Sequence, residues 1–102
     1  MPGMHVISRK RLLEADRQYG GIGTQLDAWY RVAKAATWGS LEDVRQVYSG
    51  ADGVPAGDRV YTVFHICGNR YRLITEIFYE NQTLLIRQVL THAEYDKGNW
   101  KK

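Results

Sequence analysis

The stretch "VYTVFHICGNRYRLITEIFYENQTLLIRQVL", residues 60–90, decides the fold that this sequence predicts. Apolar and polar side chains alternate along it, which is the period of two that a half-buried β-strand shows. Two turn signals, Gly68-Asn69 and Asn81-Gln82, interrupt the alternation. The pattern therefore predicts an antiparallel meander of three strands, which cover residues 60–67, 70–79 and 83–91.

Two-residue loops at both turns would determine the register of this meander. Phe64 would then face Leu73, and Leu73 would also face Leu90, so that one face of the sheet is apolar. The same face would contain the pairs Ile66 with Tyr71, and Ile77 with both Val60 and Ile86.

The second face of the predicted sheet is mixed and basic. His65 would lie opposite Arg72, and Glu76 would lie opposite both Tyr61 and Arg87. A slip of one residue in the last strand would exchange the two faces, so this prediction depends on the register. The side chains between the polar ones would be Ile74, Phe78 and Val89.

The residues before the meander predict helices. Ser8 would cap a helix from residue 9 to about Tyr19, and a third, short helix would start at Ser40. Between them, Thr24 and Asp27 approximate a capping box for the second helix. Apolar residues then recur at steps of three and four, at Leu26, Trp29, Val32, Ala33 and Ala36.

These elements predict an α+β domain in which two or three N-terminal helices pack on one face of a three- to four-stranded antiparallel sheet. The Gly-rich residues 49–58 predict a loop, and residues 5–8 form a candidate edge strand. At 102 residues, the chain fits one domain, residues 1–102. Because Met4 is an equally good start, we interpret residues 1–3 as an alternative start or an artificial extension, and residues 98–102 as a tail that frays.

Composition narrows the class of protein. The net charge of +3 permits a polyanionic partner, and nine of the fourteen basic residues are Arg, which can grip phosphate through two parallel hydrogen bonds. Cys67 is the single cysteine, so no CxxC pair occurs. No apolar run approaches the roughly 20 residues of a membrane span, and no signal peptide follows the basic start. We therefore expect a soluble, cytoplasmic protein without a membrane partner.

The sequence lacks metal and nucleotide motifs, so we expect no metal and no cofactor. The three histidines are far apart, and neither HExxH nor a P-loop occurs. Arg, His, Tyr and Lys side chains remain, and they suit cleavage of RNA through its own 2′-hydroxyl, which needs a base, an acid and cations. A solvated basic face and a polar tail would explain the same composition. The candidates for catalysis are Arg72, Arg87, His92, Tyr95 and Lys97.

Two segments, "GNRYRLI" at 68–74 and "IRQVLTHAEYDKGNW" at 86–100, resemble the HigB family of toxins, in the RelE superfamily of bacterial toxin–antitoxin systems. The likeness covers nearly the whole chain, and THxEYDK is its most specific motif. It implies a RelE-like fold and an endoribonuclease (mRNA interferase) that cleaves mRNA on the ribosome without a metal. It also implies a HigA-type antitoxin with a helix-turn-helix as the inhibitory partner, with a heterotetramer as one expected assembly.

The resemblance also implies roles for the residues that match its motifs. Arg72 and Arg87 would neutralise the scissile phosphate, while His92, Tyr95 and Lys97 would share the base, acid and charge-stabilising roles, in an order that stays open. Asn69 matches the family motif, but it also suits the turn at Gly68-Asn69, and this turn role is an alternative to a role in the site. His65 departs from the family pattern, as does the Gly-rich insert at 49–57. The expected RNA-binding residues are His65, Asn69, Arg70, Arg72, Arg87 and Lys97.

Two other functions fit the same residues. A non-catalytic RNA- or ribosome-binding module would use the same Arg-rich face, and it would leave RNA intact. A ParE-type member of the superfamily would act on DNA gyrase without a nuclease role. The THAEYDK segment at 91–97 argues against the gyrase alternative.

Overall fold

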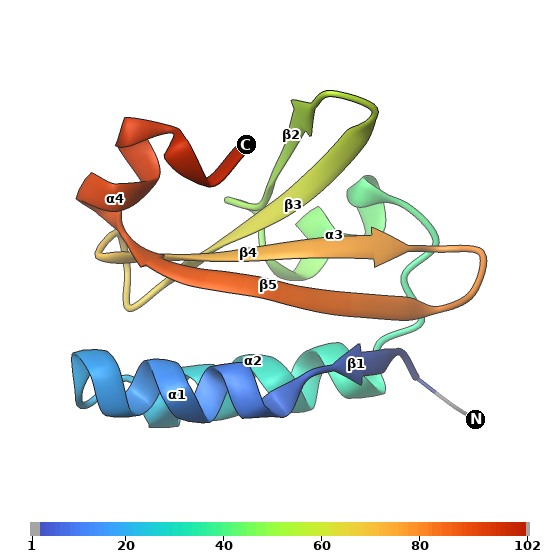
Figure 1. Ribbon diagram of the computed structural model, residues 1–102. Helices are drawn as coiled ribbons and strands as arrows, with labels where there is room; N and C mark the ends of the chain where they lie inside the picture. The colour runs from blue at the N-terminus through green and yellow to red at the C-terminus, as the bar shows by residue number, and fades with distance from the viewer. Residues whose placement is uncertain (1–2, 102) are drawn as a thin grey trace.

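The computed structural model of the protein describes residues 3–101, and it places a five-stranded sheet between two N-terminal helices on one side and a short C-terminal helix on the other (Figure 1). Parts of the predicted N-terminal extension and tail, residues 1, 2 and 102, lie outside the described residues. The elements are β1 (His5–Ile7), α1 (Arg9–Tyr19), α2 (Gly23–Ala35), α3 (Leu41–Val47), β2 (Asp52–Ala56), β3 (Arg59–Ile66), β4 (Tyr71–Phe78), β5 (Thr83–Thr91), α4 (His92–Lys97) and a 3₁₀ turn, η1 (Asn99–Lys101).

The α+β class is confirmed, but the sheet is larger than predicted and is mixed. Its strand order is β1-β5-β4-β3-β2, and β1 pairs in parallel with β5, which confirms the predicted edge strand. The residues predicted as a loop contain β2, which pairs antiparallel with β3. Gly57, at φ 67°, allows the tight turn between these two strands. Strand β2 contains Gly53 and Pro55, which are tolerated because the strand lies at the sheet edge.

The predicted register between β3 and β4 is confirmed. Phe64 pairs with Leu73, and His65 pairs with Arg72. The turn between the strands differs in detail, because its left-handed residues are Cys67, at φ 55°, and Gly68, at φ 68°. Asn69 remains within this turn, which the hydrogen bond from the Arg70 amide to the Cys67 carbonyl closes.

The predicted register between β4 and β5 is wrong, and two local features explain the error. The connecting turn spans four residues, from Tyr79 to Gln82, because the Gln82 amide donates to the Tyr79 carbonyl and the Gln82 side chain donates to the Trp38 carbonyl at 2.6 Å. A β-bulge then follows between the pairs Thr75–Ile86 and Ile74–Gln88, and Arg87 is its extra residue. Leu73 consequently pairs with Val89 in place of Leu90, and Arg72 pairs with Leu90.

The bulge changes which face each side chain of β5 occupies. The four-residue turn shifts the register by two, which leaves every side chain on its predicted face, whereas the single extra residue exchanges the faces of the residues after it. Val89 therefore packs toward the helices, and Leu90 packs on the opposite face. Nearer the turn, Ile77 pairs with Leu84 in place of Ile86, and Glu76 pairs with Leu85 in place of Arg87.

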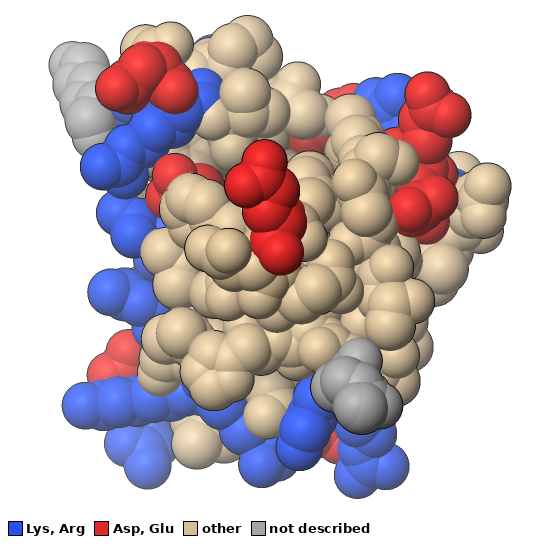
Figure 2. Space-filling model, turned by 90° about the vertical axis from the view of Figure 1, so that its right-hand side faces the viewer, with Lys and Arg blue, Asp and Glu red and all other residues tan. Residues whose placement is uncertain are grey.

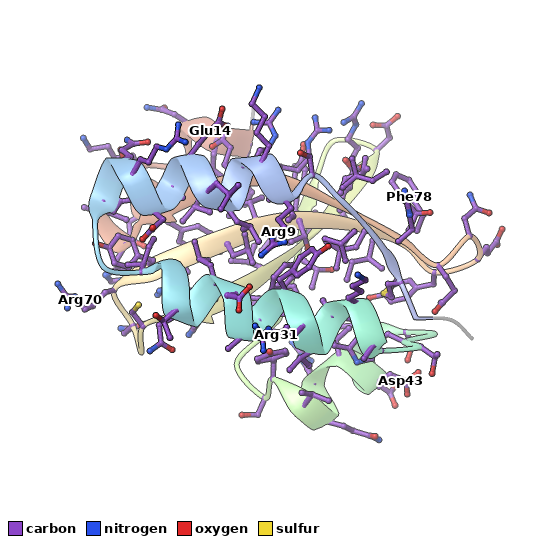
Figure 3. All side chains as sticks on the ribbon, turned by 90° about the horizontal axis from the view of Figure 1, so that it is seen from below. Arg9, Glu14, Arg31, Asp43, Arg70 and Phe78 are labelled. Atoms are coloured by element: carbon purple, nitrogen blue, oxygen red, sulfur yellow. The ribbon has the colours of Figure 1, made fainter. Side chains whose placement is uncertain are left out.

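Helices α1 and α2 lie side by side over one face of the sheet (Figure 3). Trp29 of α2 packs edge-on against Phe64 of β3, with ring centroids 5.3 Å apart, and Trp38 stacks on the same Phe64. Val32 is an exception to the predicted apolar stripe, because 38% of it is exposed. None of the helices within residues 3–101 is long and apolar enough to cross a membrane.

The helix starts follow the predicted caps in two of three cases. The Ser8 hydroxyl accepts a hydrogen bond from the Lys10 amide at the start of α1, and Ser40 caps α3. Helix α2 begins at Gly23 without a side-chain cap from Thr24. Its first amide donates instead to the Asp16 carboxylate of α1, at 2.8 Å, so the two helices are joined where the chain reverses.

Candidate active site on the sheet face beneath the C-terminal helix

The face of the sheet opposite α1 and α2 carries a second, smaller apolar cluster. Tyr61, Val63 and Ile74 form its buried part, and Tyr95 and Trp100 of the C-terminal segment pack against it. The chain therefore folds back over the face that contains His65 and Arg72, as the sequence analysis expects of residues after the last strand (Figure 1). The predicted fraying tail is a 3₁₀ turn as far as Lys101.

Helix α4 has no buried residue, so specific polar contacts hold it in place. Thr91 and Glu94 form a reciprocal capping box, in which the Glu94 amide donates to the Thr91 hydroxyl and the Thr91 amide donates to the Glu94 carboxylate. The bond from the Thr91 amide lowers the pKa of Glu94. The sequence "THAE" at 91–94 is the signature of this cap, and it could have predicted the start of α4 from the sequence.

A second contact joins α4 to the helix layer. The Tyr19 hydroxyl, at the end of α1, lies 3.1 Å from a Glu94 carboxylate oxygen and 3.2 Å from the Val89 carbonyl oxygen. Burial and the hydrogen bond to Glu94 raise the pKa of Tyr19 to about 12, so the phenol stays protonated and can donate. Tyr19 therefore connects α1 to the helix that carries half of the candidate site.

Replacing Tyr19 with Phe should test this connection. The variant keeps the ring, which lies 5.1 Å from Tyr71, and loses the donor. We expect the free energy of unfolding to fall by about 1 kcal/mol, and the melting temperature to fall by about 4–8 °C, as measured by circular dichroism. Tyr30→Phe is the matched control, because the Tyr30 ring contacts the cations of Arg9 and Lys34. Equal melting temperatures for Tyr19→Phe and the wild type would show that the connection contributes nothing.

Arg72 lies at the centre of the site and is only 5% exposed, whereas the sequence analysis placed it on an exposed face. Its guanidinium donates to the backbone carbonyl and the side-chain oxygen of Asn69, and to the Tyr71 carbonyl, at 2.8–3.2 Å. The Tyr95 ring covers it, with the guanidinium carbon 5.4 Å from the ring centroid. No carboxylate within residues 3–101 pairs with it in an ion pair. Arg72 thus supplies a positive charge that neutral oxygens hold in position.

Tyr95 is the aromatic lid over this charge. Its ring stacks on Trp100, with centroids 5.1 Å apart and planes 17° apart. Burial raises its pKa above the usual 10.0, and the Asp52 carboxylate adds to this effect, while Arg72 opposes it. The phenol is therefore protonated at neutral pH, and it is suited to donate a proton.

His65 lies beside Arg72 on the neighbouring strand. Burial lowers its pKa below the usual 6.5, and the positive charge of Arg72 lowers it further, against the opposing effect of Asp52. The imidazole is consequently neutral at pH 7, and a neutral imidazole can accept a proton. Asp52 was not among the predicted site residues, because it belongs to β2, which the sequence analysis assigned to a loop.

His92 opens α4 at the rim of the site. Its amide donates to the Arg70 carbonyl at 2.9 Å, and its Nε2 lies 3.4 Å from the Asp96 carboxylate, one helical turn away. His92 is also the last and smallest of the causes that lower the pKa of His65. The structure thus brings together residues that the sequence predicts for catalysis or RNA binding: His65 and Arg72 lie on neighbouring strands, and Tyr95, on the same helix as His92, covers Arg72.

Arg87 forms a separate part of this face. As the bulged residue of β5 it lies three residues before Leu90, the partner of Arg72, which is about 10 Å along the strand. Its Nε lies 3.9 Å from the Glu76 carboxylate, and Arg59 reaches the same carboxylate at 3.5 Å. Because two arginines share one carboxylate, one positive charge is left over at this position.

Comparison with known proteins identifies the class to which this arrangement belongs. Residues 23–98 match the family model HigB_toxin, the RelE-like toxic component of a toxin-antitoxin system. The chain belongs to the HigB toxin family. The match includes every predicted site residue from His65 to Lys97, and it leaves out Tyr19 and Trp100. Membership of a family of toxic components implies an antitoxin as partner.

Curated relatives support the HigB assignment over nearly the whole chain. The mRNA interferase toxin HigB of Escherichia coli K12 is 33% identical over 93 residues, which are 91% of this chain and 88% of the relative. The mRNA interferase HigB of Shigella flexneri has the same identity and coverage. The mRNA interferase HigB of Escherichia coli O6:H1 is 31% identical over 94 residues, which are 92% of this chain and 90% of the relative.

Three further residues that the HigB resemblance predicted take different places in the structure. Lys97 is exposed on the last turn of α4. Asn69 acts as the acceptor that positions Arg72. The Arg70 side chain projects away from the molecule at the turn between β3 and β4, at the opposite end of β4 from Phe78, and so it does not join the cluster (Figure 3).

The distribution of charge around the HigB fold is uneven. In the view of Figure 2, Lys and Arg gather along the left and lower borders, while acidic side chains lie near the centre and toward the upper corners. Within residues 3–101, no group of three or more His, Cys, Asp or Glu side chains is arranged to hold a metal ion. The site therefore combines the cations of Arg72 and Arg87 with the nearby carboxylates of Glu76 and Asp52.

Proposed function

We propose that this chain is a ribosome-associated endoribonuclease that cleaves mRNA and so inhibits translation, as the toxin of a type II toxin–antitoxin system. The observation that carries the proposal is the cluster of His65 and Arg72, on neighbouring strands, with Tyr95 of α4 over Arg72. It combines a proton acceptor, a buried positive charge and a proton donor on one face of the sheet. The relatives are named mRNA interferases, which supports the same activity.

The proposed reaction uses the 2′-hydroxyl of the RNA as nucleophile. His65 accepts the 2′ proton, the 2′ oxygen forms a bond to the adjacent phosphorus, and the bond from phosphorus to the 5′ oxygen of the next nucleotide breaks. Tyr95 gives its phenolic proton to that departing oxygen. The products are a 2′,3′-cyclic phosphate and a free 5′-hydroxyl, so atoms and protons balance.

Positive charges stabilise the phosphorus centre as negative charge grows on its oxygens. Arg72 acts from beneath Tyr95. Asn69 holds its guanidinium group in position before the substrate arrives, so the guanidinium does not have to reorient during the reaction. Arg87, with its shared carboxylate, contacts the RNA backbone farther along β5. Lys97 on the last turn of α4 adds positive charge, and His92 lies on the first turn of the same helix. In this scheme protein cations take the role that a metal ion has in other nucleases.

The proposal extends to location and partners. A toxin of this kind acts in the cytoplasm, where the ribosome and mRNA are found. Its antitoxin would be of the HigA type with a helix-turn-helix, and a heterotetramer of two toxins and two antitoxins is the expected assembly. Co-purification of the chain with the product of the neighbouring reading frame would test this part, and the mass of the complex in solution would give its stoichiometry.

Controlled expression in bacteria tests the enzymatic proposal. The wild type should stop growth and translation, and mRNA fragments should end in a 2′,3′-cyclic phosphate, which ligation specific for that end detects. Arg87→Ala and His92→Ala should reduce both effects, whereas Arg31→Ala on α2 and His5→Ala on β1 are matched controls on other parts of the fold.

Two results would contradict the proposed activity, and a third would contradict the assignment of its residues. Growth arrest with intact mRNA would indicate a non-catalytic RNA-binding module. Arrest accompanied by loss of gyrase supercoiling activity would indicate a gyrase toxin. Equal toxicity of the wild type and both variants would show that the site is assigned to the wrong residues.

A further inference from the structure

A hollow lies between the end of β5 and α4, beside the cluster of His65, Arg72 and Tyr95. Its volume is about 370 Å³, which is within the range of about 300–1,000 Å³ typical of small-molecule sites. It is open to solvent on the outer side. The six residues that line it are Gln88, Leu90, Glu94, Lys97, Asn99 and Trp100.

The chemistry of this lining fits a flat, polar-edged ring. Trp100 supplies an aromatic surface and Leu90 an apolar one, and stacking on an aromatic side chain is worth about 1–3 kcal/mol per nucleobase. The amides of Gln88 and Asn99 each offer a donor and an acceptor, which is the pattern that a base edge requires. Lys97 adds a positive charge at the same rim.

Trp100 is held rigidly enough to act as a wall. Its indole Nε1 donates to the Tyr95 carbonyl at 2.9 Å, and its ring stacks on Tyr95 and meets Tyr61 edge-on at 5.6 Å. Gln88 pairs with Ile74 in the sheet, so its side chain points to the face that carries Arg72. A ligand would therefore meet walls that are already in position, which lowers the cost of binding.

A neighbouring hollow of about 240 Å³ connects this site to Arg87. It shares Gln88, Leu90 and Glu94 with the first hollow, and it is also lined by Arg87 and by Arg11 of α1. A single RNA strand with a phosphate at Arg87 would thus bring an adjacent base to Gln88. The exchange of faces at the bulge creates this arrangement, because it places Gln88 and Leu90 on the RNA side of β5.

We propose that the hollow between β5 and α4 is a nucleobase subsite, in which Trp100 and Leu90 enclose one base of the RNA substrate while Gln88 and Asn99 read its edge. The inference rests on the proposed endoribonuclease function, and it adds that these residues set the sequence preference of cleavage. A base with a matching edge satisfies both amides. A base with the wrong edge would cover these two exposed amides without pairing them, which costs binding.

The test compares cleavage positions across cellular mRNAs, mapped by sequencing of 5′-hydroxyl ends. Gln88→Ala and Asn99→Ala should each reduce the preference for the favoured base at one position relative to the cut by about fivefold to tenfold, while cuts at other bases persist. Trp100→Phe should retain more of the preference than Trp100→Ala. Gln25→Ala, which removes an exposed amide from α2, is the matched control and should keep the wild-type profile.

The outcomes separate this inference from the function on which it rests. A wild type that leaves mRNA intact would overturn the proposed function. A wild type that cuts with a base preference that survives in Gln88→Ala and Asn99→Ala would overturn the subsite alone. As a binding readout, a 2′-O-methyl trinucleotide, which cannot be cleaved, should shift the side-chain amide NMR signals of Gln88 and Asn99 more than that of Gln25. Shifts confined to backbone signals near Arg87 would contradict base recognition.

Discussion

Replacing Arg72 with Ala should reduce mRNA cleavage by about 100- to 1,000-fold, the usual loss when one preorganised group that stabilises transition-state charge is removed. The guanidinium is buried, is held by the carbonyl and side-chain oxygen of Asn69, and lies beneath Tyr95, so no other cation can take its position. Single-turnover cleavage of a defined mRNA on purified ribosomes measures the change.

Two further variants separate charge from geometry. Arg72→Lys keeps the positive charge but loses the planar fork that binds Asn69 at two oxygens, so it should recover only part of the rate. Arg31→Ala on α2 is the matched control. Thermal unfolding must accompany each assay, because loss of a buried arginine also removes packing. A folded Arg72→Ala protein that cleaves at the wild-type rate would refute the role.

The dependence of cleavage on pH should report His65 and Tyr95. A base acts when it is deprotonated, and the pKa of His65 is lowered below 6.5, so the midpoint of the acidic decline in rate should lie below pH 6.5. An acid acts when it is protonated, and the pKa of Tyr95 is raised above 10.0, so no alkaline decline should appear up to about pH 9. Rates measured from pH 5 to 9 test both statements.

Variants test His65 and Tyr95 separately. Tyr95→Phe keeps the ring over Arg72 and removes the proton donor, so the rate should fall by about 100- to 10,000-fold. His65→Gln should cause a loss of similar size and should abolish the decline at low pH. If His65→Gln retained the acidic decline, another group would be the base, and His92, which interacts with His65, would be the next candidate.

The sequence predicted the strands and helices that have strong local signals. The period of two through residues 60–90, the caps at Ser8 and Ser40, and the pairing of His65 with Arg72 all follow from short-range patterns. Strand β2 lacked such a signal, because residues 49–58 have the composition of a loop and the strand exists through its pairing with β3. Propensity is a weak guide where the neighbouring strand supplies the hydrogen bonds.

The register of β5 depended on contacts that no local pattern contains. The four-residue turn before it is anchored by Gln82 to the carbonyl of Trp38, more than forty positions away in the chain. The bulge at Arg87 leaves no signature in the sequence. The sequence therefore offered Arg72 and Arg87 as candidate site residues, but it predicted neither the burial of Arg72 nor the separation of the two arginines along the sheet.

The extra residue in β5 also divides the strand into two segments with opposite parity. Before Arg87, the even-numbered Leu84 and Ile86 face the helices, and after it the odd-numbered Val89 does so. Deleting Arg87 would restore a single alternation and would leave Val89 facing the helices and Leu90 on the opposite face. The nine residues of β5 thus supply side chains both to the hydrophobic core and to the opposite face of the sheet. The one inserted residue is what places both sets on these sides.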